Sequence, residues 1–281
     1  MPHPDRLLRT LRQAVRACDQ TTGRTGHLLC LDDADEIFVA GDLHGNVENF
    51  RRLLAGAALG DHPGRHLVMQ ELVHGPHQYP NGSDKSHQLV DLMAALKCQY
   101  PERAHLLLGN HELAQWQEHW IAKGNLNLIE CFRAGVETAY RDAATEIYDT
   151  YLEFFARTPL AIRTPNRVFM SHSLPSSKRL ESFDPAVLEA DVHSDKDLTH
   201  GGGVYSLLWG RDTQAATATR FLELVNADHL ITGHIPCPRG FDTPNDRQLV
   251  LDCMGEPAAY CLFPAKKSLT HEQIVDCVHV L

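Results

Sequence analysis

Five apolar stretches of the sequence end in side chains of the types that bind metal ions. In "EIFVAGDLHGN" a carboxylate and an imidazole stand two residues apart, flanked by glycines that free the backbone. "HLVMQE" ends in a glutamate, "HLLLGNHE" carries an asparagine and a histidine, and "RVFMSH" and "HLITGH" each end in a histidine. The candidate residues are Asp42, His44, Glu71, Asn110, His111, His172 and His234. A single junction could be a polar turn, but five in one chain indicate a shared site.

Carboxylate, imidazole and amide ligands without thiolates suit manganese, iron, nickel or zinc. Two such ions ~3.5–4 Å apart, bridged by a carboxylate, can share a water molecule and hold a phosphate during in-line displacement. The ions lower the pKa of that water, so that hydroxide exists at neutral pH, and they neutralise charge on the phosphoryl oxygens. The pattern is therefore compatible with hydrolysis of a phosphoester.

Alternating strands and helices have to position these side chains. The patterns predict strands at Glu36–Ala40, His66–Gln70, Ala104–Leu108, Arg167–Ser171 and His229–Thr232. They predict helices at Val47–Ala58, Ser86–Tyr100 and Gln214–Val225, and a helix-rich segment at Glu112–Arg157 that is interrupted near Gly124–Leu126. The final third is strand-rich, with "RQLVLDC" and "AAYCLF". This order is typical of an α/β domain built on a sheet sandwich, with function in the loops at the carboxyl ends of the strands.

We expect one domain, residues 1–281, with residues 1–30 as a helical extension and residues 112–157 as a helical segment. In "MPHPDRLLRTLRQAVRAC" one helical face carries Leu7, Leu8, Leu11 and Val15, which indicates a helix docked on the domain surface. The segment lacks the apolar core of a signal peptide, and no stretch of the sequence approaches the length of a membrane span. We therefore expect a cytoplasmic protein with no membrane partner.

Charge and cysteine content exclude further classes. The formal charge of −10 argues against a nucleic-acid partner, which normally requires a basic surface. A phosphorylated substrate would have to be attracted by local positive charge. The eight cysteines are scattered without a Cys-x-x-Cys pair, so we interpret them as reduced and mostly part of the core. A zinc ribbon or a disulfide framework is not expected.

Several motifs resemble those of the calcineurin-like metallophosphoesterases, and more closely their phosphoprotein-phosphatase branch. "GDLHGN" looks like the first motif of that branch, and "GNHE" is identical to the third. "SHQLVDLMAALKCQYPERAHLLLGNHE" is similar to the helix and strand before the third motif, and "LLWGRD" to a stretch between the fourth and fifth. The resemblance covers most of residues 36–263 and implies an α/β fold with a central β-sandwich flanked by helices.

The resemblance also implies roles for individual residues. Asp42 and His44 would bind one metal ion, and Glu71 would bridge to a second ion. The ligands of that second ion would be Asn110, His172 and His234. His111 would be the general acid that protonates the leaving oxygen. The alternative for His111 is a residue that caps the N-terminus of a helix.

The second motif departs from the family pattern, which has Gly-Asp followed closely by Asp-Arg-Gly. Gln70 and Glu71 stand at the Gly-Asp positions, and no arginine follows in "QELVHGPHQYPNGSDKSHQ". The aspartate that orients the catalytic histidine and the arginine that grips phosphate therefore lack their usual positions. Asp84 is the candidate for the orienting carboxylate, and its alternative is an aspartate near a helix N-terminus. His74 and His77 are either donors that support the ligands or simple loop residues.

For phosphate contact the candidates are Arg211 in "WGRD", together with Asn110 and His111. Lys85 and Arg239 rank behind Arg211, and each of these cations could equally be an ordinary surface residue. The run "HGGG", His200–Gly203, resembles the oxyanion-hole run of lipases, but the sequence lacks a Gly-x-Ser-x-Gly turn. No Gly-Lys-Ser/Thr follows it either, so a P-loop is excluded. We expect a flexible glycine loop near the site.

These observations predict a phosphoester hydrolase that uses hydroxide activated by two divalent or transition-metal ions (Mn, Fe, Zn or Ni). The "LLWGRD" and Ser86–Glu112 segments favour a phosphatase like the serine/threonine protein phosphatases, acting on a phosphoprotein or a small phosphoester. The alternative enzyme is a hydrolase like bis(5′-nucleosyl)-tetraphosphatase, which uses much the same metal motifs. A non-catalytic scaffold of the same fold is disfavoured, because all six implied ligands are present.

Overall fold

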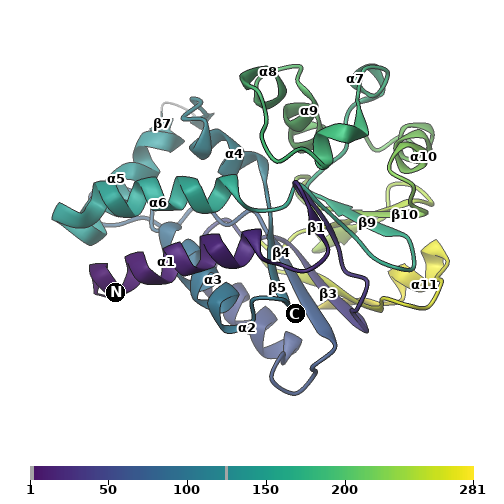
Figure 1. The fold of residues 1–281 in the computed structure, drawn as a ribbon, viewed down its shortest axis with the longest axis horizontal. Coiled ribbons are helices and arrows are strands. Elements are labelled where there is room, and N and C mark those ends of the chain that lie inside the picture. Colours follow the sequence, from purple (N-terminus) through teal and green to yellow (C-terminus); the bar gives the residue numbers. More distant parts are fainter. Residues whose placement is uncertain (1–2, 124–125) are drawn as a thin grey trace.

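Two β-sheets make up the centre of the computed structural model, which describes residues 3–123 and 126–281 (Figure 1). In spatial order, one sheet of the described residues contains β14 (Val278–Val280), β13 (Ala259–Pro264), β3 (Glu36–Asp42), β4 (Arg65–Gln70) and β5 (Ala104–Leu107). The other contains β1 (Arg24–Thr25), β2 (Leu28–Cys30), β8 (Ala161–Arg163), β9 (Val168–Ser171), β10 (His229–Thr232), β12 (Gln248–Leu251) and β11 (Phe241–Asp242). The predicted sandwich of two sheets is confirmed.

Side chains of the central strands are buried on both faces. Along β3, Ile37 and Val39 join an apolar cluster that includes residues of both sheets, whereas Phe38 and Ala40 join the larger cluster shared with the helices. The alternation follows from the two-residue period of a strand. Burial on both faces explains why β3 and β4 appear in the sequence as nearly continuous apolar runs.

Helices flank the sandwich (Figure 1). The longer ones are α1 (Pro4–Asp19), α2 (Val47–Ala57), α3 (His87–Gln99), α5 (Leu128–Tyr140), α6 (Ala144–Ala156) and α10 (Ala215–Leu224). The shorter ones are α4 (Asn110–Trp116), η1 (Arg141–Ala143), α7 (Ser177–Leu180), η2 (Pro185–Leu188), α8 (Asp195–Leu198), α9 (Gly203–Trp209) and α11 (His271–Val275). α1 packs on α3 and α6 through its predicted apolar face. Among the described residues, every helix falls short of the length and apolarity that a bilayer span requires.

The two sheets touch at the carboxyl ends of β3 and β12. A Cβ atom at Gly41 would lie 2.2 Å from the carbonyl oxygen of Leu251, so a larger residue could not be accommodated there. Asp42 and Asp252, the next residues, form an isolated parallel bridge. Because β3, β4 and β5 run parallel, as do β9, β10 and β12, this contact brings the carboxyl ends of strands from both sheets together.

The structure differs from the predicted elements in places where segments are short. The second half of the predicted extension 1–30 is not helical, since β1 and β2 form a hairpin and β2 pairs with β8; residues 1–2 lie outside the described residues. The helical segment is interrupted near 124–126 as predicted, by the short strands β6 (Ala122–Lys123) and β7 (Leu126–Asn127). Residues 124–125 themselves lie outside the described residues. The predicted glycine loop is shorter than expected, because Gly203 begins α9.

Candidate metal centre

The sequence-predicted ligands lie at or just beyond the carboxyl ends of five strands, around a cavity of about 90 Å³. Among its lining residues are Asp42, His44, Glu71, Asn110, His111, Arg211, His234 and Asp252. His44, Glu71 and His234 have positive φ angles of 42°, 48° and 67°, a strained backbone for residues with a Cβ atom. Such strain is concentrated at functional sites, where the surrounding structure holds it in place.

Behind this cavity, lone pairs of three side chains converge. His172 Nε2 lies 2.6 Å from Glu71 Oε2 and 2.8 Å from Asn110 Oδ1. The Nδ1–H of His172 donates to Gln70 Oε1 at 3.0 Å, and Gln70 is held in that orientation because its Nε2 donates to the Ala40 carbonyl oxygen at 3.1 Å. A neutral His172 carries its single ring proton at Nδ1, so its Nε2 can only accept. When Glu71 is ionised, none of the three converging atoms carries a proton, and such an arrangement suits a cation.

Two overlapping groups of ligand atoms arise in this way. Within the described chain, two groups of three side chains bring possible ligand atoms within 4.8 Å of one another. The first group is His44, Glu71 and His111, and the second is Glu71, His172 and His234. Glu71 is common to both, as expected of a bridging ligand. The Nδ1–H of His44 donates to the Val73 carbonyl oxygen at 2.9 Å, which leaves Nε2 available.

Asp42 lines the same cavity, although it is outside both groups. Its Oδ2 accepts the backbone N–H of His234 at 2.9 Å. Its Oδ1 is buried and, within the described residues, has no hydrogen-bond partner. A Cβ atom at Gly233 would lie 2.1 Å from that oxygen, so only glycine leaves room for the carboxylate. An unpartnered buried carboxylate oxygen of this kind fits the role of a metal ligand.

The electrostatics of the site favour divalent cations. Burial, followed by the Glu71 carboxylate, raises the pKa of Asp42 well above its ordinary value, and burial also raises the pKa of Glu71. Burial lowers the pKa of His172 to about 3 and that of His234 to about 2. Burial thus disfavours the ionised form of the two carboxylates and keeps the imidazoles neutral. A cation would stabilise the ionised carboxylates, and metals bind carboxylates and neutral imidazoles. Ligand atoms of a first-row ion, each ~2.1 Å from it, lie ~3 Å apart, as the His172 contacts do.

The histidine predicted to be the general acid contacts another histidine. His111 Nδ1 lies 2.7 Å from His74 Nδ1. Asp84 instead accepts the N–H and the hydroxyl of Ser86, each at 2.8 Å, directly before α3. Asp84 therefore does not orient His111 directly, which corrects the sequence prediction. Its hydrogen bonds match the alternative of an aspartate near a helix N-terminus. His77 is exposed in the same loop.

Of the predicted phosphate contacts, Arg211 lines the cavity, and its Nε–H donates to His234 Nε2 at 3.1 Å. Lys85 and Arg239 lie over aromatic rings, with their charged groups 5.0 and 5.6 Å from the ring centroids, and are not among the residues that line the cavity. Arg211 is thus the cation that the structure brings to the site from this set.

Two residues at the site, Asp252 and Gln70, were missed as contributors by the sequence analysis, which left His74 open between a donor that supports the ligands and a simple loop residue. Asp252 follows β12 in "RQLVLDC", the same pattern of apolar strand and carboxylate that marks Asp42, so that signal could have found it. It accepts the N–H groups of Cys237 and Met254, each at 2.9 Å. Gln70 carries no such signal, and the sequence does not decide between the two interpretations of His74, because the contacts of both residues are with residues far away in the sequence.

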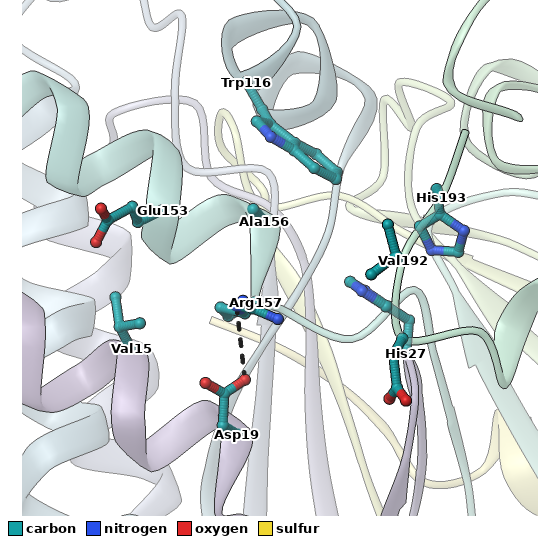
Figure 2. A pocket seen from close by; sticks show the side chains of 10 residues that line it. Val15, Asp19, His27, Trp116, Glu153, Ala156, Arg157, Val192 and His193 are labelled. Carbon is teal, nitrogen blue, oxygen red and sulfur yellow. Dashed lines mark ion pairs between the residues drawn. The ribbon is translucent and has the colours of Figure 1, made fainter. Parts of the chain in front are cut away.

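A second, larger cavity of about 460 Å³ lies beside α1 and α6 (Figure 2). The Asp19 carboxylate pairs with Arg157 at 3.8 Å, and the His27 and His193 rings lie 4.7 Å apart. The Nδ1–H of His27 donates to the Thr158 carbonyl oxygen at 3.1 Å. Neither of the two groups of possible metal ligands in the described residues includes a residue that lines this larger cavity. The chemistry is therefore assigned to the smaller cavity.

Comparison with known proteins shows which proteins this chain resembles. The profile of the family described as calcineurin-like phosphoesterase matches residues 36–238. Serine/threonine-protein phosphatase 5 of Homo sapiens is 23% identical over 256 residues, covering 82% of this chain and 46% of the human protein. A probable serine/threonine-protein phosphatase of Encephalitozoon cuniculi is 22% identical over 228 residues, covering 75% and 44%. The chain thus spans less than half the length of these relatives.

Solved structures show the same fold. A serine/threonine phosphatase from Saccharomyces cerevisiae, described as similar to human phosphatase PP5, superposes with a TM-score of 0.72 at 16% identity, over 100% of this chain and 89% of that chain. A cold-active protein-tyrosine phosphatase from a Shewanella species gives 0.60 at 16% identity, over 91% and 82%. The predicted resemblance and fold class are confirmed, and the expectation of a phosphoester hydrolase is confirmed at the level of the family. Since the profile matches more than half of its residues, the chain belongs to the calcineurin-like phosphoesterase family.

Proposed function

We propose that the chain hydrolyses phosphate monoesters with two divalent transition-metal ions. The observation that carries this proposal is the convergence of Glu71 Oε2 and Asn110 Oδ1 on His172 Nε2, at 2.6 and 2.8 Å, while the Nδ1–H of His172 donates to Gln70. The residues that would hold the ions are Asp42 and His44 for one, Asn110, His172 and His234 for the other, and Glu71 for both. When bound, such ions supply a nucleophilic water and neutralise charge on the phosphate, and manganese, iron, zinc or nickel suits this set of ligands.

His111 would donate a proton to the leaving oxygen. Its ring lines the cavity beside His44, with ring centroids 5.0 Å apart, and its Nδ1 is already occupied by His74. Nε2 therefore remains for the substrate. Burial, followed by His74, lowers the pKa of His111 well below its ordinary value, whereas a phosphate dianion beside the ring would act in the opposite sense. Binding of the substrate thus favours the protonated form that catalysis needs.

Arg211 would hold the phosphate. Its Nε–H now occupies His234 Nε2. If His234 binds an ion through Nδ1, which faces His172 at 3.2 Å, a neutral ring must carry its proton at Nε2 and can no longer accept from Arg211. The guanidinium is then released to the cavity, where its fork of donors matches phosphate oxygens.

The size of the cavity favours a substrate that inserts little more than its phosphate. A volume of about 90 Å³ is small beside the ~300–1,000 Å³ of most small-molecule pockets. The rest of the substrate would lie outside, near Pro236 and the half-exposed Met254 at the rim. A phosphoserine or phosphothreonine side chain on a protein meets this condition, and the likeness to serine/threonine phosphatases supports the same choice.

The experiment is a side-by-side assay of protein loaded with manganese. It compares p-nitrophenyl phosphate, phosphoserine and phosphothreonine peptides, and diadenosine tetraphosphate. We expect turnover of the first three, loss of activity with a chelator and recovery with added ions. Turnover of the dinucleotide alone would replace the proposal by the tetraphosphatase function. Absence of any turnover, with ions bound, would favour a non-catalytic scaffold.

A cytoplasmic location is part of the proposal. All eight cysteines lie in described parts of the chain and carry free thiols. Free thiols in this number are typical of a reducing compartment.

A further inference from the structure

A pair of histidines links the site to the helical side of the molecule. The rings of His74 and His111 meet edge to face, with centroids 4.9 Å apart and an interplanar angle of 66°, and their Nδ1 atoms are 2.7 Å apart. At that distance one proton must lie between the two nitrogens, so one ring donates and the other accepts. His74 is buried, and its backbone has a positive φ of 62°.

The contacts of Gln115 decide which ring donates. Gln115 Oε1 lies 2.8 Å from His74 Nε2, and its Nε2 donates to the hydroxyl of Tyr148 at 2.5 Å. An amide oxygen only accepts, so His74 carries a proton at Nε2. Burial lowers the pKa of His74 to about 4, so the ring is neutral and has one proton. Its Nδ1 therefore accepts from the Nδ1–H of His111.

The backbone of His74 is held as firmly as its ring. Its N–H donates to Ser86 Oγ at 3.0 Å, and the Ser86 hydroxyl donates to Asp84 at 2.8 Å. The Phe132 ring lies against the imidazole, edge to face, with centroids 6.0 Å apart. Asp84 thus supports the loop that carries His74 and acts on His111 only through Ser86 and His74.

We propose that His74 is the positioning residue for His111: it accepts the Nδ1–H of that ring and so presents Nε2 to the leaving oxygen of the substrate. The inference rests on the proposed function of His111 as proton donor. A neutral imidazole does this here, in place of a carboxylate. It fixes the orientation and the tautomer of His111 without adding a negative charge beside the metal centre.

Substitutions of His74 separate the acceptor from the bulk of the ring. The Oδ1 atom of asparagine is bonded to Cγ, as Nδ1 of histidine is, so His74→Asn keeps an acceptor at the same place. His74→Phe keeps a ring and removes the acceptor. For a phosphoserine peptide we expect His74→Phe to lower kcat ~10–100-fold with KM and bound metal unchanged, and His74→Asn to restore kcat to within a few-fold.

Two comparisons sharpen this test. The loss in His74→Phe should be smaller for p-nitrophenyl phosphate, because nitrophenolate leaves without a proton. His77→Ala, in the exposed part of the same loop, serves as the control and should match the wild type. Full kcat in His74→Phe, or an asparagine variant no better than the phenylalanine variant, would overturn the proposal.

Nitrogen NMR of the zinc-loaded protein, with ¹⁵N-labelled histidine, tests the proposal without turnover. The signals of His111 are assigned from His111→Asn. We expect its ring to be protonated at Nδ1 in the wild type and in His74→Asn, and to lose that preference in His74→Phe. A neutral His111 protonated at Nε2 in the wild type contradicts the assignment. A wild type that hydrolyses no phosphoester would refute the proposed function, whereas this measurement would still decide the His74–His111 contact.

Discussion

Two of the cavities in the described part of the chain differ in a property that their volumes do not reveal. The cavity beside α1 and α6 measures about 460 Å³ and the one at the strand ends about 90 Å³. In the larger one, Asp19 pairs with Arg157 near solvent and His27 is satisfied by a carbonyl oxygen. Within the described residues, the larger cavity has one unpartnered imidazole nitrogen, His193 Nε2, whereas the smaller one has two unpartnered carboxylate oxygens, Asp42 Oδ1 and Glu71 Oε2. Unpartnered buried carboxylates, rather than space, mark the place where a cationic ligand belongs.

The construction of the two regions explains the difference. The small cavity is built from the ends of packed strands, where Gly41 lets the two sheets touch and Gly233 makes room for a carboxylate. The large cavity lies between helices and the segment 191–193, in which Val192 is 82% exposed. Strand ends in a packed core can hold strained and unpaired groups in place, whereas an exposed segment cannot.

The largest effect on chemistry is expected at His111. His111→Asn should lower turnover of a phosphoserine peptide by ~10²–10⁴, the usual contribution of a general acid, and leave the bound metal nearly unchanged. The loss should shrink for p-nitrophenyl phosphate. Elemental analysis and steady-state kinetics on the same preparation check both points. Loss of a metal ion in this variant would instead make His111 a ligand.

A smaller effect is expected where a side chain only orients a ligand. Gln70 accepts the Nδ1–H of His172, so Gln70→Leu should free that ring and weaken the affinity of one metal site ~10–100-fold. Competition with a chelator of known affinity measures the change. Gln78→Leu, at an exposed position of the neighbouring loop, is the matched control. Equal affinities in the two variants would show that His172 needs no such support.

In the larger cavity, a pH effect on stability is expected without an effect on catalysis. Burial lowers the pKa of His27 to about 4, against ~6.5 in an unfolded chain. Between these values the unfolded chain binds the extra proton, so stability is lost as the pH falls below ~6.5. From pH 7.5 to 5.0 the wild type should lose ~2 kcal/mol relative to His27→Asn, whose amide can still donate to Thr158. Urea unfolding of both proteins at the two pH values measures this, and parallel pH dependences would contradict it.

The smallest effect is expected from the ion pair in the same cavity. Asp19 and Arg157 are half-exposed, so Asp19→Asn should change the free energy of unfolding by less than ~1 kcal/mol. Turnover and metal content should equal those of the wild type. A clear loss of activity would show that the two cavities are functionally linked.

Strong periodic patterns made much of the fold, and the convergence of the candidate ligands at strand ends, predictable from sequence. β10 has the predicted bounds, β4 and α2 differ from theirs by one residue at one end, and α3 is one residue shorter than predicted at each end. The six ligands follow apolar runs, and parallel strands end at one edge of a sheet. The sequence did not predict β1, β2 and β8, because strands of two or three residues have too few side chains to show a period.

The features of the site that the sequence missed or left open depend on contacts between residues that are far apart in the sequence. Gln70 lies 102 residues from His172, and His74 lies 37 residues from His111. Nothing local distinguishes His74 from His77, which is exposed. Asp84 was proposed for its charge, but the side chain that contacts His111 is His74, because His74 is buried and its ring faces His111. The sequence thus predicts which residue types can take part in the chemistry, but not which side chains contact one another in the folded chain.

The central claim is that Glu71 holds two ions at once, and metal stoichiometry tests it most directly. Two divalent cations at close range repel each other, and a neutral amide does not offset that repulsion. Equilibrium dialysis against manganese, followed by elemental analysis, should give about two ions per chain for the wild type and for Glu71→Asp. Glu71→Gln should bind fewer ions and lose most of its turnover. A Glu71→Gln variant with both ions and full turnover, or a wild type that hydrolyses its substrate without any bound metal, would contradict the account.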